Sequence, residues 1–201
     1  MSEQILAAQH ESSEVATPGP IIVVSGPAGV GKSTVSRLIA AAFNRSVHLQ
    51  TDDLLASVVN GWVDPALPEA ERQNEAIGAA LAVAAMSFAQ DGYTTIVDGY
   101  LFPDGVAGLA DACRGRHLSC HYVVLAADAE TCWTRASDRP EGRWPLEPGP
   151  VAQVYARFAN CGVDETHVVE ATANEDEVAS IVLAALRDGT LAVAEPPRNS
   201  N

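Results

Sequence analysis

Residues 20–43 combine a short apolar run, a glycine-rich turn and a helical pattern, in that order along the chain. The run at 20–25 (PIIVVS) is continuously apolar, as is typical of a strand buried in a parallel sheet. The turn at 26–33 has the spacing G-x-x-x-x-G-K-S. An apolar stripe at helical spacing follows it, made of Val35, Leu38, Ile39, Ala42 and Phe43. A strand, a tight turn and an amphipathic helix in this order predict an α/β fold.

The turn has the chemistry of a phosphate-binding loop (P-loop). Its glycines let successive backbone N–H groups curl around a phosphate, and the start of a helix adds positive potential. We expect Lys32 to neutralise the β- and γ-phosphates of ATP and the Ser33 hydroxyl to ligate Mg²⁺. Lys32 is the one lysine in the chain, since its other basic residues are arginines. The predicted nucleotide-binding residues are Gly26, Pro27, Ala28, Gly29, Val30, Gly31, Lys32, Ser33 and Thr34.

Further apolar segments of strand length alternate with helical patterns along the rest of the chain. These predicted strands lie at 47–51, 93–97, 120–126 and 167–171. The alternation predicts a three-layer, doubly wound sheet of five parallel strands with helices on both faces. At 201 residues, the chain suits a single domain of this kind. We place that domain at 19–191 and expect flexible segments at 1–18 and 192–201.

The charge balance argues against several classes of partner. With 26 acidic and 12 basic residues, the net charge of −14 repels nucleic-acid backbones, so we expect no nucleic-acid partner. The longest apolar run, at 76–89, falls short of the roughly 20 residues that a membrane span requires. The amino terminus lacks the basic stretch of a secretory signal, and the four cysteines lack metal-ligand spacing. We expect a cytoplasmic protein with reduced cysteines and no membrane partner, and the oligomeric state stays open.

Acidic residues follow two of the predicted strands. Asp52 and Asp53 come directly after Thr51, and Asp98 follows the strand at 93–97. The carboxyl ends of parallel strands meet at one edge of a sheet, so we expect these carboxylates near the P-loop. Asp52 is then a candidate general base for an acceptor hydroxyl, and Asp98 a candidate Mg²⁺ ligand through water. The alternatives are that Asp52 caps the next helix, that Asp53 serves the metal or the surface, and that Asp98 is a solvated strand end.

Arginines gather near the end of the helix expected at 129–137. Arg135 and Arg139 are four residues apart, as on one helix face, and Arg143 follows in a segment rich in proline and glycine. In phosphoryl transfer, a segment that brings arginine to the developing charge is a lid, which we place at about 138–150. Arg135 and Arg139 are therefore candidate catalytic residues. The alternative is a solvated helix end paired with nearby carboxylates.

Three further sets of residues stay ambiguous between function and packing. The segment 57–74 lies where acceptor-binding insertions usually sit, and its polar or aromatic candidates are Trp62, Asp64, Gln73 and Asn74. Two aromatic residues after the third strand either wall an acceptor pocket or join the core: Tyr100 and Phe102. Histidines on or beside strands are interpreted as structural: His48, His117, His121 and His167.

Four short motifs together resemble the small P-loop kinases of the nucleoside-monophosphate-kinase-like group. They are GPAGVGKST at 26–34, TDDL at 51–54, TTIVDGY at 94–100 and TRASDRPEGR at 134–143. Within that group the chain is similar to chloramphenicol phosphotransferase and related ATP-dependent kinases. The resemblance implies a strand order of 2-3-1-4-5, a base at Asp52 and helix-end arginines at Arg135 and Arg139. The segment 57–74 does not match the antibiotic kinase, so the resemblance leaves the substrate open.

These observations predict an ATP-dependent phosphotransferase that moves the γ-phosphoryl of ATP to a hydroxyl of a small molecule, such as an antibiotic or a sugar-like compound. One alternative is a nucleoside or nucleotide kinase, or a sugar-nucleotide kinase similar to the zeta-toxin kinases. Such acceptors favour further arginines in the segment 57–74, where only Arg72 is present. The other alternative is a non-enzymatic ATP-binding module that switches a partner by its nucleotide state.

Overall fold

The computed structural model of the chain describes residues 17–138 and 148–193. Its first half contains β1 (Ile21–Ser25), α2 (Lys32–Ala41), β2 (Ser46–Gln50), α3 (Thr51–Ala56), the 3-10 helix η2 (Pro68–Ala70) and α4 (Glu71–Gln90). Its second half contains β3 (Thr94–Asp98), α5 (Pro103–Arg114), β4 (Cys120–Ala126), α6 (Ala129–Ser137), α7 (Pro148–Asn160), the 3-10 helix η3 (Glu165–His167), β5 (Val168–Glu170) and α8 (Glu175–Arg187). Most of the two segments predicted to be flexible, 1–18 and 192–201, lies outside the described residues.

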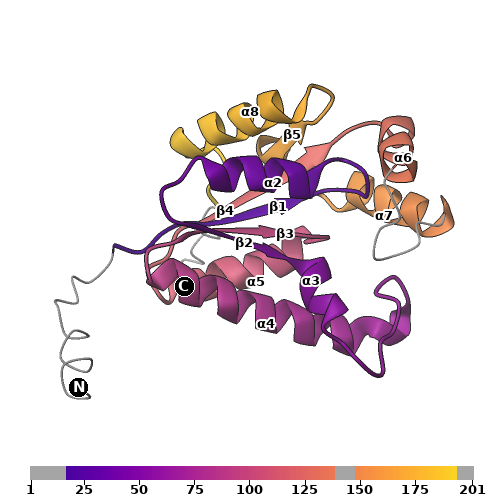
Figure 1. The fold of residues 1–201 in the computed structure, drawn as a ribbon, viewed down its shortest axis with the longest axis horizontal. Coiled ribbons are helices and arrows are strands. Elements are labelled where there is room, and N and C mark those ends of the chain that lie inside the picture. The colour runs from indigo at the N-terminus through magenta and orange to yellow at the C-terminus, as the bar shows by residue number, and fades with distance from the viewer. Residues whose placement is uncertain (1–16, 139–147, 194–201) are drawn as a thin grey trace, which may run out of the picture.

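Five parallel strands form one sheet in the order β2-β3-β1-β4-β5, which confirms the order 2-3-1-4-5. Helices α2 and α8 cover one face of the sheet, and α4 and α5 cover the other (Figure 1). In the register of the sheet, Asp98 at the end of β3 lies beside Val24 of β1 and Gln50 of β2. The carboxyl ends of these three strands are therefore level, so the loops that follow them meet at one edge.

Alternate residues of the central strands pack into two separate cores. Ile22, Val24 and Ile96 belong to the core under α2 and α8. Ile21 and Val97 belong to the core under α4 and α5. Side chains two residues apart on a strand share a face, so the residue two positions after Ile96 projects toward α2. That residue is Asp98, which is 4% exposed.

Several predicted strands are shifted or shortened by one residue at an end, and two of the differences in element boundaries have a clear physical reason. The second strand ends at Gln50 rather than Thr51, because Thr51 begins α3 and donates its hydroxyl to the backbone oxygen of Asp98 at 2.8 Å. Helix α7, the last α-helix before β5, begins at Pro148, inside the proline- and glycine-rich segment predicted as a lid at about 138–150. A helix tolerates proline in its first turn, where the backbone N–H groups have no partner within the helix.

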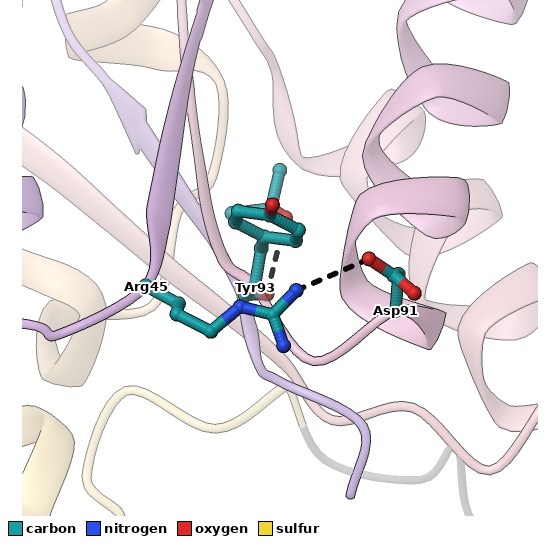
Figure 2. A network of polar contacts seen from close by, with 4 residues as sticks. Arg45, Asp91 and Tyr93 are labelled. Carbon is teal, nitrogen blue, oxygen red and sulfur yellow. Dashed lines mark hydrogen bonds and ion pairs between the residues drawn. The ribbon is translucent and has the colours of Figure 1, made fainter. Parts of the chain in front are cut away.

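At the opposite, amino-terminal edge of the sheet, a surface contact connects the segments that precede β2 and β3. The Arg45 guanidinium lies 4.2 Å from the ring centroid of Tyr93 and donates to Asp91 at 3.2 Å, as Figure 2 shows. This contact links the start of β2 to the turn before β3. Within the described residues, no helix is both long enough and apolar enough to cross a bilayer.

Candidate active site

The P-loop leads from β1 directly into α2. Gly31 caps the helix with a left-handed φ of 100°, which a residue with a Cβ rarely adopts. Its carbonyl accepts from the N–H groups of Thr34 and Val35 at 3.1 and 3.0 Å, so the helix is regular from its first turn. A Cβ at Gly31 would project into open space. This geometry leaves the loop accessible at the start of α2, where a phosphate is favoured.

The P-loop packs tightly against α6 at Gly29. Its φ is 78°, and a Cβ there would collide with the carbonyl oxygen of Cys132 and approach Ala136 to 3.1 Å. Only a glycine allows α6 to lie this close to the loop. The contact brings Arg135, one residue before Ala136, to the vicinity of the predicted phosphate site.

Lys32 holds its ammonium across the P-loop. Its Nζ donates to the backbone oxygen of Pro27 at 2.9 Å and lies 4.5 Å from the ring centroid of Tyr100. Burial and the nearby carboxylate of Asp128 raise the pKa of the Cys132 thiol, while Lys32 and Arg135 lower it. Lys32 and Arg135 therefore both interact electrostatically with the thiol of Cys132, a residue that packs against Gly29 of the P-loop.

A buried hydroxyl joins β1 to the loop after β3. The Oγ of Ser25 donates to the backbone oxygen of Gly99 at 3.1 Å and accepts from the N–H of Leu101 at 2.9 Å. The hydroxyl of Tyr122 donates to the carbonyl of Leu101 at 2.8 Å, and burial raises the pKa of that phenol. These bonds fix the loop that carries Tyr100 relative to the P-loop.

Asp98, the candidate ligand of Mg²⁺ through water, lies at the carboxyl end of β3. Its side chain contacts a second residue, His48, in the structure. Its Oδ2 lies 2.8 Å from Nε2 of His48, and both side chains are nearly buried, at 6% and 12% exposed. His48 was predicted to be only structural, and its contact with a candidate ligand was missed. Asp98 projects from the face of the sheet that α2 covers, and Ser33 lies in the first turn of α2. The two predicted metal-binding residues therefore share one side of the sheet.

Asp52 and Asp53 occupy the first turn of α3, where both are exposed. The residue that caps α3 is Gln50, so the alternative in which Asp52 is the helix cap is wrong. Strand β3 lies between β2 and β1, so the end of β2, which leads into α3, is about 10 Å from the end of β1 across the sheet. The role of Asp52 as a base stays a prediction.

Only part of the predicted lid lies within the described residues. Asp138 is the C-cap of α6, and 148–150 form the start of α7. Arg139 lies in 139–147, outside the described residues, together with Arg143. Helix α6 ends at Ser137, as predicted, and the predicted pairing of Arg135 with Arg139 on one face involves a residue outside the described part of the chain.

Arg135 itself is described. Its Nη1 donates to the backbone oxygen of Ala171 at 2.8 Å. Ala171 directly follows β5, so this bond joins α6 to the turn before α8. The bond fixes the guanidinium at the carboxyl end of β5, and its role in stabilising charge at the P-loop stays a prediction.

Polar residues of the segment 57–74 hold that segment together. The side-chain amide of Gln73 donates to the carbonyl of Val63 at 2.8 Å and accepts from its N–H at 2.9 Å. Asn74 donates to the carbonyl of Pro65 at 2.9 Å, and Asp64 accepts from the N–H of Ala66 at 2.9 Å. These contacts support the packing interpretation of Gln73, Asn74 and Asp64. Trp62 is 38% exposed in the same segment.

The aromatic residues after β3 meet α7. The rings of Phe102 and Phe158 stack at 4.6 Å and 27°, and Tyr100 lies 6.4 Å from Phe158. No local pattern indicates that Phe158 belongs to this group, because it lies more than fifty residues later in the chain. Figure 1 shows α3, α6 and α7 around the end of the sheet at which β3 finishes.

Solved structures show the same fold at low sequence identity. A sugar kinase from Janibacter sp. is 19% identical, with a TM-score of 0.65, and the match covers 88% of this chain and 100% of that chain. A gluconokinase from Sinorhizobium meliloti is 21% identical, with a TM-score of 0.58, and the match covers 86% and 94%. An APS kinase from Mycobacterium tuberculosis, solved with AMPPNP and APS, is 15% identical, with a TM-score of 0.60, and the match covers 85% and 98%.

Sequence comparisons give two results. The search of curated proteins finds no match. A family model described as an AAA domain matches residues 21–161, which is more than half of the chain and includes the P-loop and α6. With its P-loop and its strand order, the chain has the fold of the P-loop kinases and belongs to this AAA domain family.

Proposed function

We propose that the protein is an ATP-dependent phosphotransferase whose acceptor is a hydroxyl group of a small molecule. One observation carries the proposal. The P-loop, with Lys32 and Ser33, and the carboxylates at the carboxyl ends of β2 and β3 occupy the same edge of the sheet. This arrangement provides a phosphate-binding side and an acidic acceptor side, which is what phosphoryl transfer to an alcohol needs.

The residues present suit a magnesium nucleotide. The loop is open at Gly31, and the start of α2 favours the phosphates. Ser33 and Asp98 offer one hydroxyl and one carboxylate, and no cage of three His, Cys, Asp or Glu side chains is found in 17–138 and 148–193. Mg²⁺ in such sites is held by one or two protein oxygens, substrate phosphates and waters. When bound, the metal would neutralise charge that develops on the phosphates.

In the proposed reaction, the acceptor oxygen bonds to the γ-phosphorus as the bond from that phosphorus to the β–γ bridging oxygen breaks. ADP leaves with the electron pair of the broken bond, and the acceptor proton passes to Asp52. Lys32 holds the phosphates, and Arg135 and Arg139 stabilise the charge of the transition state. The narrower resemblance to chloramphenicol phosphotransferase remains a prediction.

The proposal is tested by mass spectrometry of reactions that contain ATP, Mg²⁺ and pooled hydroxyl compounds. The pools are phenicols, aminoglycosides, nucleosides, nucleotides, sugars, sugar acids and polyols, and the Lys32→Ala protein is the blank. We expect a product one phosphoryl group heavier that forms only with the unaltered protein. The position of the new phosphate identifies the hydroxyl that reacts. ATP binding without a product in any pool would contradict the proposal and favour the nucleotide-dependent switch.

A further inference from the structure

The aromatic cluster, defined as Tyr100, Phe102 and Phe158, extends from the P-loop lysine to α7. Its near end is Tyr100, whose ring lies 4.5 Å from Nζ of Lys32 and is 44% exposed. Its far end is the stacked pair of Phe102 and Phe158. The cluster therefore starts at the phosphate-binding loop and runs away from it along the carboxyl edge of the sheet.

Arg157 lies at the far end of the aromatic cluster. Its guanidinium carbon is 3.7 Å from the ring centroid of Phe102, which is the distance of a stacked cation. A guanidinium stacked on a ring keeps its N–H groups at its own edge, where they can bind an anion in a bidentate way. Arg157 is exposed, so its edge can be reached from solvent.

Arg157 differs from Arg45, which also lies over an aromatic ring, in whether it forms an ion pair. Arg45 lies over Tyr93 and also forms an ion pair with Asp91. No carboxylate among residues 17–138 and 148–193 lies within ion-pair distance of Arg157. In a chain with net charge −14, Arg157 is therefore a cation that lies against a ring and forms no ion pair with a carboxylate of the described residues.

We infer that the acceptor is itself an anion, a small hydroxyl compound whose carboxylate or phosphate binds Arg157 while its carbon skeleton packs on the aromatic cluster. This inference rests on the proposed function and narrows its substrate class. A neutral acceptor would not gain an ion pair with Arg157, whereas the net charge of −14 would otherwise repel an anionic acceptor. Arg157 is thus an acceptor-binding residue, and it takes no part in the chemistry.

The test compares acceptors that differ in one charged group. D-gluconate is paired with sorbitol, and thymidine monophosphate with thymidine, each at saturating ATP and Mg²⁺. We expect the unaltered protein to prefer the anionic member of at least one pair. Arg157→Gln is expected to raise KM for that acceptor by about 10- to 100-fold, as loss of a charge-assisted hydrogen bond does. Its KM for ATP and its kcat are expected to change little, and Arg157→Lys is expected to recover part of the loss.

Arg45→Gln is the matched control, because it removes a ring-stacked arginine from the opposite edge of the sheet (Figure 2). We expect it to leave the kinetics unchanged. A response to gluconate alone would assign a carboxylate, and a response to the nucleotide alone a phosphate. Equal use of the neutral members, or an unchanged KM in Arg157→Gln, would overturn the inference while the proposed function stands.

A binding measurement keeps the inference separate from the proposed function. Calorimetric titration of the protein with gluconate and with thymidine monophosphate, without turnover, reports acceptor binding directly. Binding that is lost in Arg157→Gln supports the inference even if no phosphoryl transfer is seen. Absence of binding for both anions, in a protein that still binds ATP, overturns it.

Discussion

Asp52 and Asp53 are neighbours in the first turn of α3, which makes them a matched pair of variants. We expect Asp52→Asn to lower kcat by about 10²–10⁴, the usual contribution of general-base catalysis, with little change in KM for ATP. Asp53→Asn removes the same charge one residue later and is expected to keep most of the rate. Steady-state kinetics with an identified acceptor measure both variants, and the reverse pattern would assign the base to Asp53.

The contact between His48 and Asp98 gives a second prediction, on stability. Replacing His48 by Leu leaves a buried carboxylate without its 2.8 Å partner. We expect the free energy of unfolding to fall by about 1.5–3 kcal/mol, the usual value of a hydrogen bond to a charged group. Urea denaturation measures it. The His48→Leu/Asp98→Asn double variant is expected to lose less than the sum of the single changes, and strict additivity would mean that the two residues are not coupled.

Residues of the site were predictable where their roles follow from spacing along the chain. Lys32 and Ser33 are placed by the turn that they belong to, so the G-x-x-x-x-G-K-S pattern is enough. His48 and Arg157 depend on which strand or helix lies beside them. Nothing within the sequence near His48 indicates Asp98, fifty residues away, because the register of β2 on β3 decides the contact.

At the scale of elements, the packing of α6 on the P-loop gives a third prediction. Gly29 and Gly61 have nearly the same φ, 78° and 76°, but only Gly29 has backbone within contact distance of a Cβ. Gly61→Ala is expected to cost about 1–2 kcal/mol, the strain of a left-handed residue. Gly29→Ala is expected to add about 1–3 kcal/mol for overpacking against Cys132, and to weaken ATP binding as α6 is displaced.

Thermal unfolding and ATP titration of the two glycine variants measure the difference. Equal losses of stability in Gly29→Ala and Gly61→Ala would show that α6 can move away from residue 29 without lowering the free energy of unfolding further. Unchanged ATP affinity in Gly29→Ala would show that the position of α6 does not matter to the nucleotide.

Elements were predicted well where a strong local pattern defines them. The apolar run of β1 and the turn into α2 are both continuous in the sequence, and the resemblance to small kinases supplied the strand order. The start of α7 at Pro148 was not predicted, because proline in a sequence usually indicates the end of a helix. In the first turn, however, proline removes no hydrogen bond of the helix. The end of β2 was missed because a contact from Thr51 to the neighbouring strand decides it.

At the scale of the whole molecule, the two edges of the sheet differ in character. The carboxyl edge carries the P-loop, the candidate base and the aromatic cluster. The amino edge is closed by residues after α8, where Leu191 and Val193 form backbone hydrogen bonds with Tyr122 and Cys120 at the start of β4. Variants at the amino edge are therefore expected to change stability without changing the chemistry.

His121 gives the prediction that belongs to this edge. It lines a cleft of about 240 Å³ between β1, α2 and α8, together with Ile22, Phe43 and the cationic Arg187. Its Nδ1 is buried and has no hydrogen-bond partner among the described residues. Burial lowers the pKa of His121 below its usual 6.5. His121 therefore binds a proton less readily in the folded protein than in the unfolded chain.

We therefore expect the free energy of unfolding to fall as the pH is lowered from about 7 to about 5. The unfolded state binds more protons at this site over that window, and one proton contributes at most about 1.4 kcal/mol per pH unit. Urea denaturation across this range is compared for the unaltered protein, His121→Leu and the surface control His117→Asn. His121→Leu is expected to flatten the pH dependence, and the control to preserve it. Equal slopes in all three proteins would place the proton uptake on other groups and mean that folding does not change the pKa of His121.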